Sequence, residues 1–439
     1  MDSVARGTLT NLATRLGAVL GVLLITTITA RLGTEQQGAF ALFTSVEGLL
    51  LALFSGFGVA LARRVSQAVA NPGSGRISST AAVSHHGLLS AMVCCCLGLG
   101  TLAGAGLWWA SVWGSTAYTT LWLLALGAPC LLLAPNVSGL WLGQGRMAPL
   151  AALTLAPPWL ALWALAGLWL AQHISLLTVL AAWVGAKVVV GLALLVMLRR
   201  SGRLAAPDWP ALRAELPFIA TIAGTGLISL LNYRAGLFVV ERLLGLSATG
   251  VYSIAVVAAE LLWFVSSALT QAVYGRIGTP DRAAAAGTTV RALQLSIIAL
   301  VLAAPLLWLA AWALLPWLLG PAYGASLNVM AVLLPGVMLF GGASALSAYF
   351  TNHAGQPLVP ARVAGLSLLL NAALSWWWVP IWGMHGAALA ASTSYAISVA
   401  VLAWAFARHA GLPLAAVLLP SAQLRRDLRA ALHLGPVIN

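Results

Sequence analysis

Apolar residues run along this chain in long uninterrupted stretches, separated by short segments that hold most of the polar and charged positions. Such a stretch needs about 20 residues to cross the roughly 30 Å hydrocarbon core of a bilayer as a helix. Barrel strands would instead alternate apolar and polar positions over about ten residues. The pattern predicts twelve membrane-spanning helices, at about 12–30, 39–61, 87–110, 117–142, 148–171, 176–198, 216–240, 249–273, 293–319, 327–350, 363–384 and 386–407. We therefore expect an all-α polytopic membrane protein.

Composition excludes a soluble protein. Of the 439 residues, 61% are hydrophobic and only 7% are charged, whereas a soluble domain carries about 25% charged residues. Prolines inside the fourth, fifth, ninth and tenth spans are expected to kink those helices. They are Pro129, Pro135, Pro157, Pro158, Pro305 and Pro335.

The arginines predict the orientation, because cytoplasmic loops carry an excess of Lys and Arg. The loops after the even-numbered spans and the C-terminal tail hold Arg63, Arg64, Arg76, Arg146, Arg199, Arg200, Arg203, Arg213, Arg276, Arg282, Arg291, Arg362, Arg408, Arg425, Arg426 and Arg429. The odd-numbered loops hold only Arg31 and Arg242. Both termini are therefore expected in the cytoplasm. The net charge of +13 is explained by topology, and we expect no nucleic-acid partner.

The cysteines offer no ligand or pairing pattern. Cys94, Cys95, Cys96 and Cys130 all fall inside predicted spans without a C-x-x-C spacing. We expect no metal site and no disulfide. The tail at 409–439 mixes a short apolar stretch with arginines, which predicts an amphipathic helix on the inner leaflet.

A short internal repeat divides the spans into two sets of six. Leu32, Gly33, Gly38 and Phe40 in "RLGTEQQGAFALF" match Leu244, Gly245, Gly250 and Tyr252 in "LLGLSATGVYSIA" at a constant offset. An offset of six helices preserves orientation, so the halves are predicted to be parallel repeats around a central cleft. The expected divisions are a bundle at 1–205, a second bundle at 206–408 and the tail at 409–439.

Arg234 interrupts the apolar seventh span, beside Asn232 and Tyr233. One interpretation is that its side chain snorkels to the outer surface. The functional interpretation is a cation that faces the cleft and binds an anionic group, since a planar guanidinium donates bidentately to phosphate oxygens. Asn232 and Tyr233 would add hydrogen-bonding capacity to the same substrate site.

Three further charges lie deep in spans. Lys187 is the only lysine in the chain, and Glu47 and Glu260 occupy nearly equivalent places in the two halves. Lys187 can pair with one glutamate as a buried structural ion pair. Alternatively, the glutamates titrate or bind a cation and so couple transport to an ion gradient, with Na⁺ or H⁺ as the ion.

Arg15 lies one turn into the first span, on the predicted cytoplasmic side. It can snorkel to the surface, or it can receive an anion from the inner leaflet. With Lys187 and Arg234 it would then form a cationic ladder through the cleft.

Three segments carry a family resemblance. The stretch from Asn11 through "ARLGTEQQGAFALF", the stretch "NYRAGLFVVERLLGLSATGVYSIAVVAAELLW" and the stretch "NAALSWWWVPIWGMHGAALAASTSY" resemble helices 1 and 2, 7 and 8, and 11 and 12 of bacterial polysaccharide-repeat flippases. This family belongs to the multidrug/oligosaccharidyl-lipid/polysaccharide exporter superfamily. The third segment matches at Asn371, Pro380, Gly383 and Gly386.

The resemblance implies a flippase in the bacterial cytoplasmic membrane. It would move undecaprenyl-diphosphate-linked oligosaccharide repeat units from the inner to the outer leaflet by alternating access, for O-antigen, capsule or exopolysaccharide synthesis. Other glycan-assembly proteins are expected as partners. This chain departs from the family at Gly236, where an acidic residue is common, and at Trp382. The first departure suggests that Arg234 lacks a nearby acidic partner and can meet an anion.

Two alternatives stay open. A drug or metabolite antiporter of the same fold would favour cationic ligands and an acidic cleft. The predicted spans of this chain instead hold three basic candidate residues and two acidic ones. A membrane-bound glycan polymerase or ligase would need catalytic groups on sizeable external loops. The odd-numbered loops are short and hold no such constellation, so we expect no enzyme.

Overall fold

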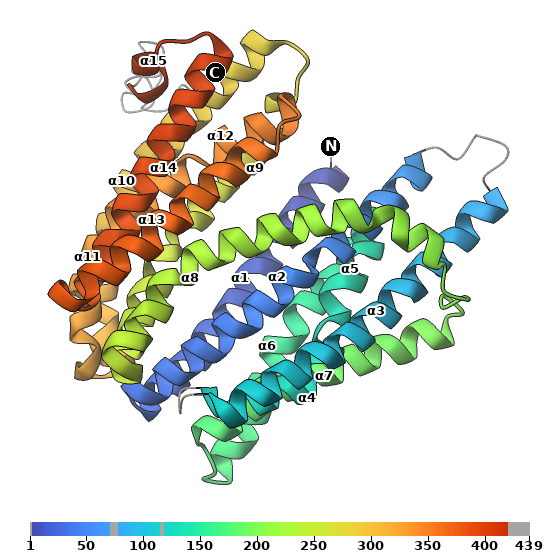
Figure 1. The fold of residues 1–439 in the computed structure, drawn as a ribbon, viewed down its shortest axis with the longest axis horizontal. Coiled ribbons are helices and arrows are strands. Elements are labelled where there is room, and N and C mark those ends of the chain that lie inside the picture. The colour runs from blue at the N-terminus through green and yellow to red at the C-terminus, as the bar shows by residue number, and fades with distance from the viewer. Residues whose placement is uncertain (1, 71–77, 115–117, 420–439) are drawn as a thin grey trace, which may run out of the picture. The chain divides into compact units, whose positions relative to one another are not determined.

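The computed structural model describes residues 2–70, 78–114 and 118–419, and this part of the chain is helical throughout, with no strand (Figure 1). The helices lie at α1 Asp2–Leu32, α2 Thr34–Ala70, α3 Ser78–Trp113, α4 Leu121–Leu131, α5 Leu133–Gly143, α6 Met147–Leu170, α7 Leu176–Arg200, α8 Trp209–Glu260, α9 Leu262–Ile277, α10 Arg282–Leu319, α11 Gly324–Gly342, α12 Ser344–Ala348, α13 Leu358–Trp382, α14 Met384–Ala410 and α15 Leu414–Leu418. A 3-10 turn, η2 Pro321–Tyr323, precedes α11, and a π-helical turn, η3 Tyr349–His353, follows α12.

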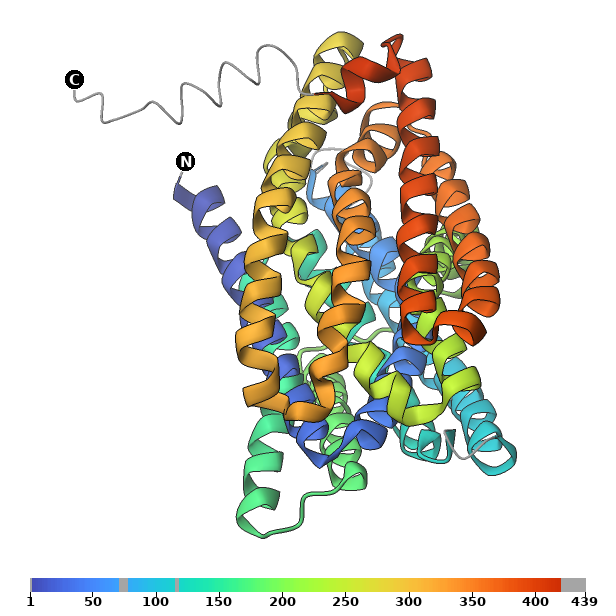
Figure 2. The same ribbon diagram turned by 90° about the vertical axis from the view of Figure 1, so that its left-hand side faces the viewer.

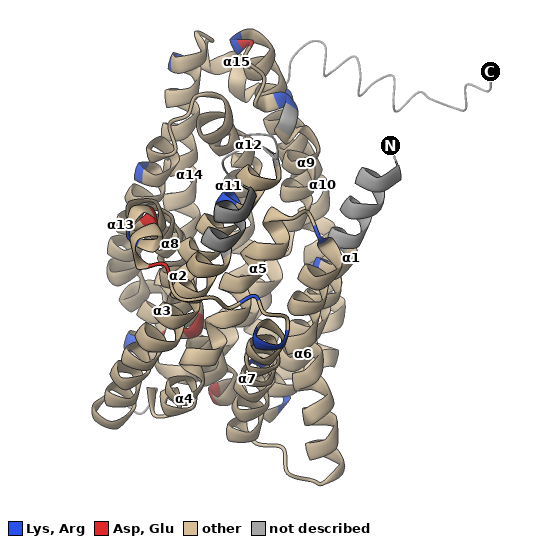
Figure 3. Ribbon diagram, turned by 90° about the vertical axis from the view of Figure 1, so that its right-hand side faces the viewer, with Lys and Arg blue, Asp and Glu red and all other residues tan. Residues whose placement is uncertain are grey.

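The predicted spans are confirmed as helices. In the described residues, 11 helical runs are long and apolar enough to cross a membrane, and one of them, Trp209–Tyr274, is 66 residues long. That run is interrupted at Gly245, whose φ of 83° is not helical. It therefore contains two of the predicted spans, 216–240 and 249–273. The protein is a multi-pass membrane protein, and Figure 3 shows how few charged positions its helices contain.

One predicted proline effect is a visible break in a helix. The fourth predicted span is divided into α4, which ends at Leu131, and α5, which begins at Leu133. Pro129 and Pro135 flank the break, and each removes a backbone donor that would have continued the ladder. The helices α6 and α10 run through their prolines.

The chain forms two compact units, Met1–Leu230 (unit 1) and Leu231–Asn439 (unit 2). Their boundary falls inside α8, later than the division at residue 205 expected from the sequence. The first part of α8 therefore belongs with the N-terminal helices. Most of the predicted amphipathic tail, including Arg425, Arg426 and Arg429, lies outside the described residues.

Four helix pairings recur in the two units. In unit 1, α3 packs on α4, α2 on α5, α6 on α7 and α4 on α7. In unit 2, α10 packs on α11, α9 on α11, α13 on α14 and α11 on α14 (Figure 2). Both sets pair the third span with the fourth, the second with the fourth, the fifth with the sixth and the fourth with the sixth. This correspondence supports the internal repeat inferred from the short sequence match.

Glycines allow the closest of these helix contacts. A β-carbon on Gly139 of α5 would lie 2.0 Å from the carbonyl oxygen of Gly58 on α2. The Gly58 N–H donates to Asn136 Oδ1 at 3.2 Å. In unit 2, a β-carbon on Gly336 of α11 would lie 2.3 Å from the Cα of Ser392 on α14. Small residues have this role in membrane bundles because they let backbones approach.

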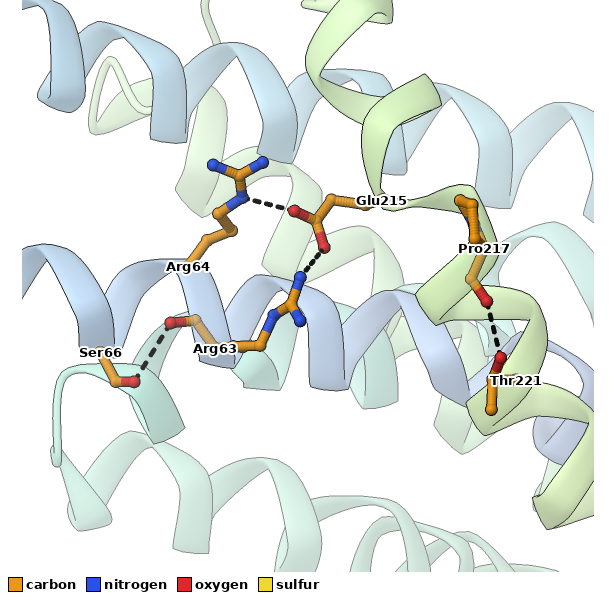
Figure 4. Close-up of polar contacts among 6 residues, drawn as sticks. All are labelled: Arg63, Arg64, Ser66, Glu215, Pro217 and Thr221. Carbon is orange, nitrogen blue, oxygen red and sulfur yellow. Dashed lines mark hydrogen bonds and ion pairs between the residues drawn. The ribbon is translucent and has the colours of Figure 1, made fainter. Parts of the chain in front are cut away.

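A buried carboxylate joins the start of α8 to unit 1. Glu215 is only 2% exposed and accepts from Arg63 Nη2 at 2.6 Å and from Arg64 Nε at 2.5 Å (Figure 4). The Arg63 guanidinium also lies 4.0 Å from the centre of the Phe218 ring. A β-carbon on Gly56 of α2 would lie 2.3 Å from the carbonyl oxygen of Ile219. These contacts explain why the unit boundary falls within α8 rather than in the loop before it.

The glycine contact can be tested by substitution. Gly139→Val is expected to destabilise unit 1 by about 1–3 kcal/mol through overpacking, seen as a lower midpoint of thermal unfolding of the purified protein in detergent. Gly98→Val is the matched control, because a β-carbon on the exposed Gly98 of α3 meets nothing within 4 Å. Equal shifts for both variants would contradict the assigned contact.

Candidate functional site

Four of the intramembrane charges singled out by the sequence form two ion pairs, one in each unit. Glu47 pairs with Lys187 in unit 1, and Glu260 pairs with Arg234 in unit 2. Charged side chains in the hydrocarbon region are costly unless they pair or face water. The two pairs differ in geometry and exposure, and that difference bears on their roles.

The unit 1 pair is closed and rigidly held. Glu47 on α2 is 3% exposed, and its Oε1 accepts from Lys187 Nζ of α7. Its Oε2 accepts from Trp183 Nε1 at 2.6 Å. Lys187 Nζ lies 3.8 Å from the centre of the Trp183 ring, so the cation is stabilised by both the carboxylate and the aromatic face. This geometry confirms the interpretation that Lys187 pairs with one of the two glutamates.

A cavity of about 240 Å³ adjoins this pair. Its lining includes Glu47, Lys187, Ser138 and Thr154 together with apolar side chains from α2, α4, α5, α6 and α7. Pro135 and Pro157 also line it, and each leaves the carbonyl four residues before it without its helical partner. The cavity is thus mainly apolar, with the Glu47–Lys187 pair and the hydroxyl residues Ser138 and Thr154 in its lining. Within the described residues, no group of three or more His, Cys, Asp or Glu side chains can hold a metal ion.

The unit 2 pair is longer and more accessible. Arg234 Nη1 and Nη2 donate to Glu260 Oε1 and Oε2 at 3.2 and 3.3 Å, with the side chains 23% and 19% exposed. The expectation that Arg234 lacks a nearby acidic partner is therefore wrong. The carboxylate comes from Glu260, at the far end of α8, rather than from position 236.

Position 236 has no room for an acidic side chain. A β-carbon on Gly236 would lie 2.6 Å from the Tyr252 hydroxyl oxygen. Tyr252 is buried and, with Glu260, Tyr233 and Tyr395, lines a cavity of about 10 Å³. A space of that size holds about one water molecule.

Aromatic rings surround the same pair. Tyr233 lies with its ring centre 4.9 Å from that of Trp263 and 5.8 Å from that of Phe340. Phe340 in turn lies 4.7 Å from Tyr395. The Arg234–Glu260 pair is thus bordered by a cluster of aromatic faces and tyrosine hydroxyls contributed by α8, α9, α11 and α14.

Asn232 faces the protein interior. It is 0% exposed, and neither its side-chain oxygen nor its side-chain nitrogen has a hydrogen-bond partner within the described part of the chain. Its backbone carbonyl accepts from Asn371 Nδ2 at 2.9 Å, and Ser375 donates to Asn371 Oδ1 at 3.2 Å. Buried amides are usually hydrogen-bonded, so the side chain of Asn232 has unused hydrogen-bonding capacity.

The structure brings together only some of the predicted site residues. Asn232, Tyr233, Arg234 and Glu260 gather in unit 2, and Glu47 and Lys187 pair in unit 1. Arg15 is exposed on α1. The cationic ladder of Arg15, Lys187 and Arg234 stays a prediction, and its middle member is neutralised by Glu47.

Sequence reasoning missed the aromatic partners. Trp183 lies four residues before Lys187 and Tyr252 eight before Glu260, spacings that place each on the same helix face as the charge. A search for aromatic residues one or two turns from an intramembrane charge would have found both. Tyr395 is far away in sequence and gave no such signal.

Comparison with known proteins supports the fold. No family model matches the chain, and no curated protein matches its sequence. An inward-facing multidrug-resistance MATE family transporter of the MOP superfamily matches with a TM-score of 0.74 at 14% identity, over 90% of this chain and 94% of that one. The lipid II flippase MurJ in an inward closed conformation matches with a TM-score of 0.71 at 13% identity, over 98% of this chain and 94% of that one.

A third similar structure is a MOP superfamily transporter from Pyrococcus furiosus, described as having a binding pocket of reverse polarity. It matches with a TM-score of 0.58 at 14% identity, over 92% of this chain and 93% of that one. All three likenesses cover nearly the whole of both chains. The protein therefore has the fold of the MATE family transporter and of the lipid II flippase MurJ.

Proposed function

We propose that this protein is a flippase that moves undecaprenyl-diphosphate-linked oligosaccharide repeat units from the inner to the outer leaflet of the bacterial cytoplasmic membrane, for cell-surface polysaccharide synthesis. The observation that carries the proposal is the partly exposed Arg234 guanidinium within a membrane-spanning helix. The shared fold with a lipid II flippase supports it, as does the sequence resemblance to polysaccharide-repeat flippases.

The physical task fits an intramembrane guanidinium. A diphosphate and its sugars cannot enter hydrocarbon, whereas the polyprenyl tail can stay in lipid. A guanidinium has five N–H donors, and Arg234 uses two of them toward Glu260. An arriving diphosphate can take the remaining donors, and Tyr233 beside Arg234 would add a hydroxyl. The buried Asn232 would join them only in a conformation that exposes it. Arg15, at the predicted cytoplasmic end of α1, would receive the same group first.

The pairing of Arg234 also supplies a coupling scheme. A diphosphate beside Glu260 places like charges together, and uptake of H⁺ or Na⁺ at Glu260 would relieve that repulsion. Substrate and ion binding would then be linked reciprocally. Glu47, which lines the cavity of unit 1, is the second proposed ion-coupling residue.

A drug or metabolite antiporter of the same fold is the second candidate. The observation that favours it is the aromatic cluster around Glu260, because aromatic faces and a carboxylate suit cationic ligands. The MATE transporters that share the fold are described as multidrug-resistance proteins. This alternative predicts that Glu260 rather than Arg234 meets the ligand.

Substitution of Arg234 distinguishes the two candidates. In a strain lacking the native gene, Arg234→Gln is expected to abolish export of the surface polysaccharide, since the anion loses its main donor. The full lipid-linked repeat unit should accumulate on the inner leaflet. Labelling each leaflet separately would detect this accumulation. Arg242→Gln, an exposed arginine on the same helix, should leave export intact. Normal export by a well-inserted Arg234→Gln protein would refute the assigned role.

A structural role of the Glu47–Lys187 pair can be tested separately from a role in ion coupling. Lys187→Ala leaves Glu47 buried without its cation and is expected to destabilise the protein by about 3–5 kcal/mol. The double variant Glu47→Leu with Lys187→Met removes both charges and should recover most of that loss in thermal unfolding. If Glu47 couples an ion, the recovered double variant will still fail in export. Export at the wild-type level would leave Glu47 with a structural role alone.

A further inference from the structure

Two consecutive arginines at one end of α2 are held by a single buried carboxylate. Arg63 and Arg64 are 42% and 43% exposed, whereas Glu215 between them is 2% exposed. Two guanidinium groups therefore share one carboxylate. The cluster keeps a net positive charge at the protein surface.

Most of the N–H donors of these arginines have no hydrogen-bond partner within the described residues. Each guanidinium has five N–H donors in a fixed plane. Arg64 contacts Glu215 through Nε, and Arg63 does so through Nη2. Within the described residues, neither terminal nitrogen of Arg64 makes a hydrogen bond, and Figure 4 shows both directed away from Glu215. Glu215 and the Phe218 ring thus hold the two planar guanidinium groups in place, while the N–H donors that point away from Glu215 remain available.

The position along α2 corresponds to the membrane interface. Arg64 lies 25 residues beyond the start of the second predicted span at 39, or about 37 Å along a straight helix. The hydrocarbon core is about 30 Å thick, so the guanidinium groups reach the level of the lipid headgroups. The arginine distribution assigns this end to the cytoplasmic leaflet.

The surroundings suit an amphipathic anion. Arg146 is exposed on a segment adjoining the cluster, because Gly143, three residues before it, packs on Val65 of α2. Trp209 and Leu216 are exposed large apolar residues seven positions apart on α8, a spacing that places them on one helix face. Their side chains offer contacts to an acyl or prenyl chain whose headgroup lies at the arginines.

We propose that Arg63 and Arg64, positioned by Glu215, form a binding site for the phosphate group of a lipid headgroup at the cytoplasmic interface. Planar guanidinium forks recognise phosphate oxygens bidentately. The ligand is an anionic phospholipid or a prenyl diphosphate, which share this chemistry. The site is separate from Arg234 and does not depend on the proposed transport function.

The test uses the full-length purified protein and native mass spectrometry of retained lipids. The probes are dioleoyl phosphatidylglycerol and geranylgeranyl diphosphate, each in competition with dioleoyl phosphatidylcholine. The wild-type protein should retain at least one anionic probe in preference to phosphatidylcholine. Tighter retention of the phospholipid or of the diphosphate then identifies which source the site takes, and retention of neither would overturn the proposal.

Three variants separate geometry from charge. Arg64→Lys keeps the charge but removes the fork, and it should weaken retention about tenfold, as expected for lost hydrogen bonds to a charged group. The double variant Arg64→Gln with Glu215→Gln removes one charge of each sign, leaves no buried carboxylate unpaired, and should weaken retention by a similar factor. Arg213→Gln lowers the charge at the same end without touching the cluster and should change retention less than twofold.

Either of two results would overturn the assignment. The first is wild-type lipid retention by both Arg64→Lys and the double variant Arg64→Gln with Glu215→Gln, with folding confirmed by thermal unfolding. It would show that the arginines only stabilise the packing of α8. An equal loss for Arg213→Gln would show that general electrostatic attraction holds the lipid, rather than a site built from Arg63, Arg64 and Glu215.

Discussion

The need to neutralise charge inside hydrocarbon governs the functional architecture of this protein. Burying an ion costs several kcal/mol unless a partner and further hydrogen bonds compensate it. In each unit a salt bridge meets this requirement. In unit 1 it joins residues of two different helices, and in unit 2 it joins residues on either side of the interruption in α8. The pairs Glu47–Lys187 and Arg234–Glu260 thereby help to define which helix faces meet.

The two pairs satisfy the same constraint in different ways. Glu47 has both carboxylate oxygens engaged and almost no exposure, which suits a fixed link between α2 and α7. Arg234 and Glu260 make longer contacts, keep part of their surface exposed and lie beside a small cavity bordered by tyrosines. A pair of this kind can exchange partners with an arriving ligand. The internal repeat thus places glutamates at nearly equivalent positions but gives them different surroundings.

Much of the fold follows from the sequence because the bilayer restricts the solutions. Long apolar runs must be helices, so the twelve spans were predictable, and the short match around Gly33 and Gly245 indicated the repeat. The partners of the charges were not predictable. The pairing of Lys187 with Glu47 rather than Glu260 depends on how α7 packs on α2, and the departure at Gly236 suggested an unpaired Arg234. Tyr252 occupies that space instead, and Glu260 provides the charge. The boundary lies inside α8 rather than at residue 205, because Glu215 near the start of α8 is a buried partner of Arg63 and Arg64, a pairing that the sequence does not reveal.

The most direct test of the central claim is transbilayer movement of a fluorescent prenyl-diphosphate-linked oligosaccharide in liposomes that contain only the purified protein. The account predicts that the labelled headgroup becomes accessible on the opposite leaflet, in a manner that requires Arg234. Absence of movement under an imposed proton or sodium gradient of either direction, together with transport of a cationic dye by the same preparation, would contradict the flippase and favour the antiporter.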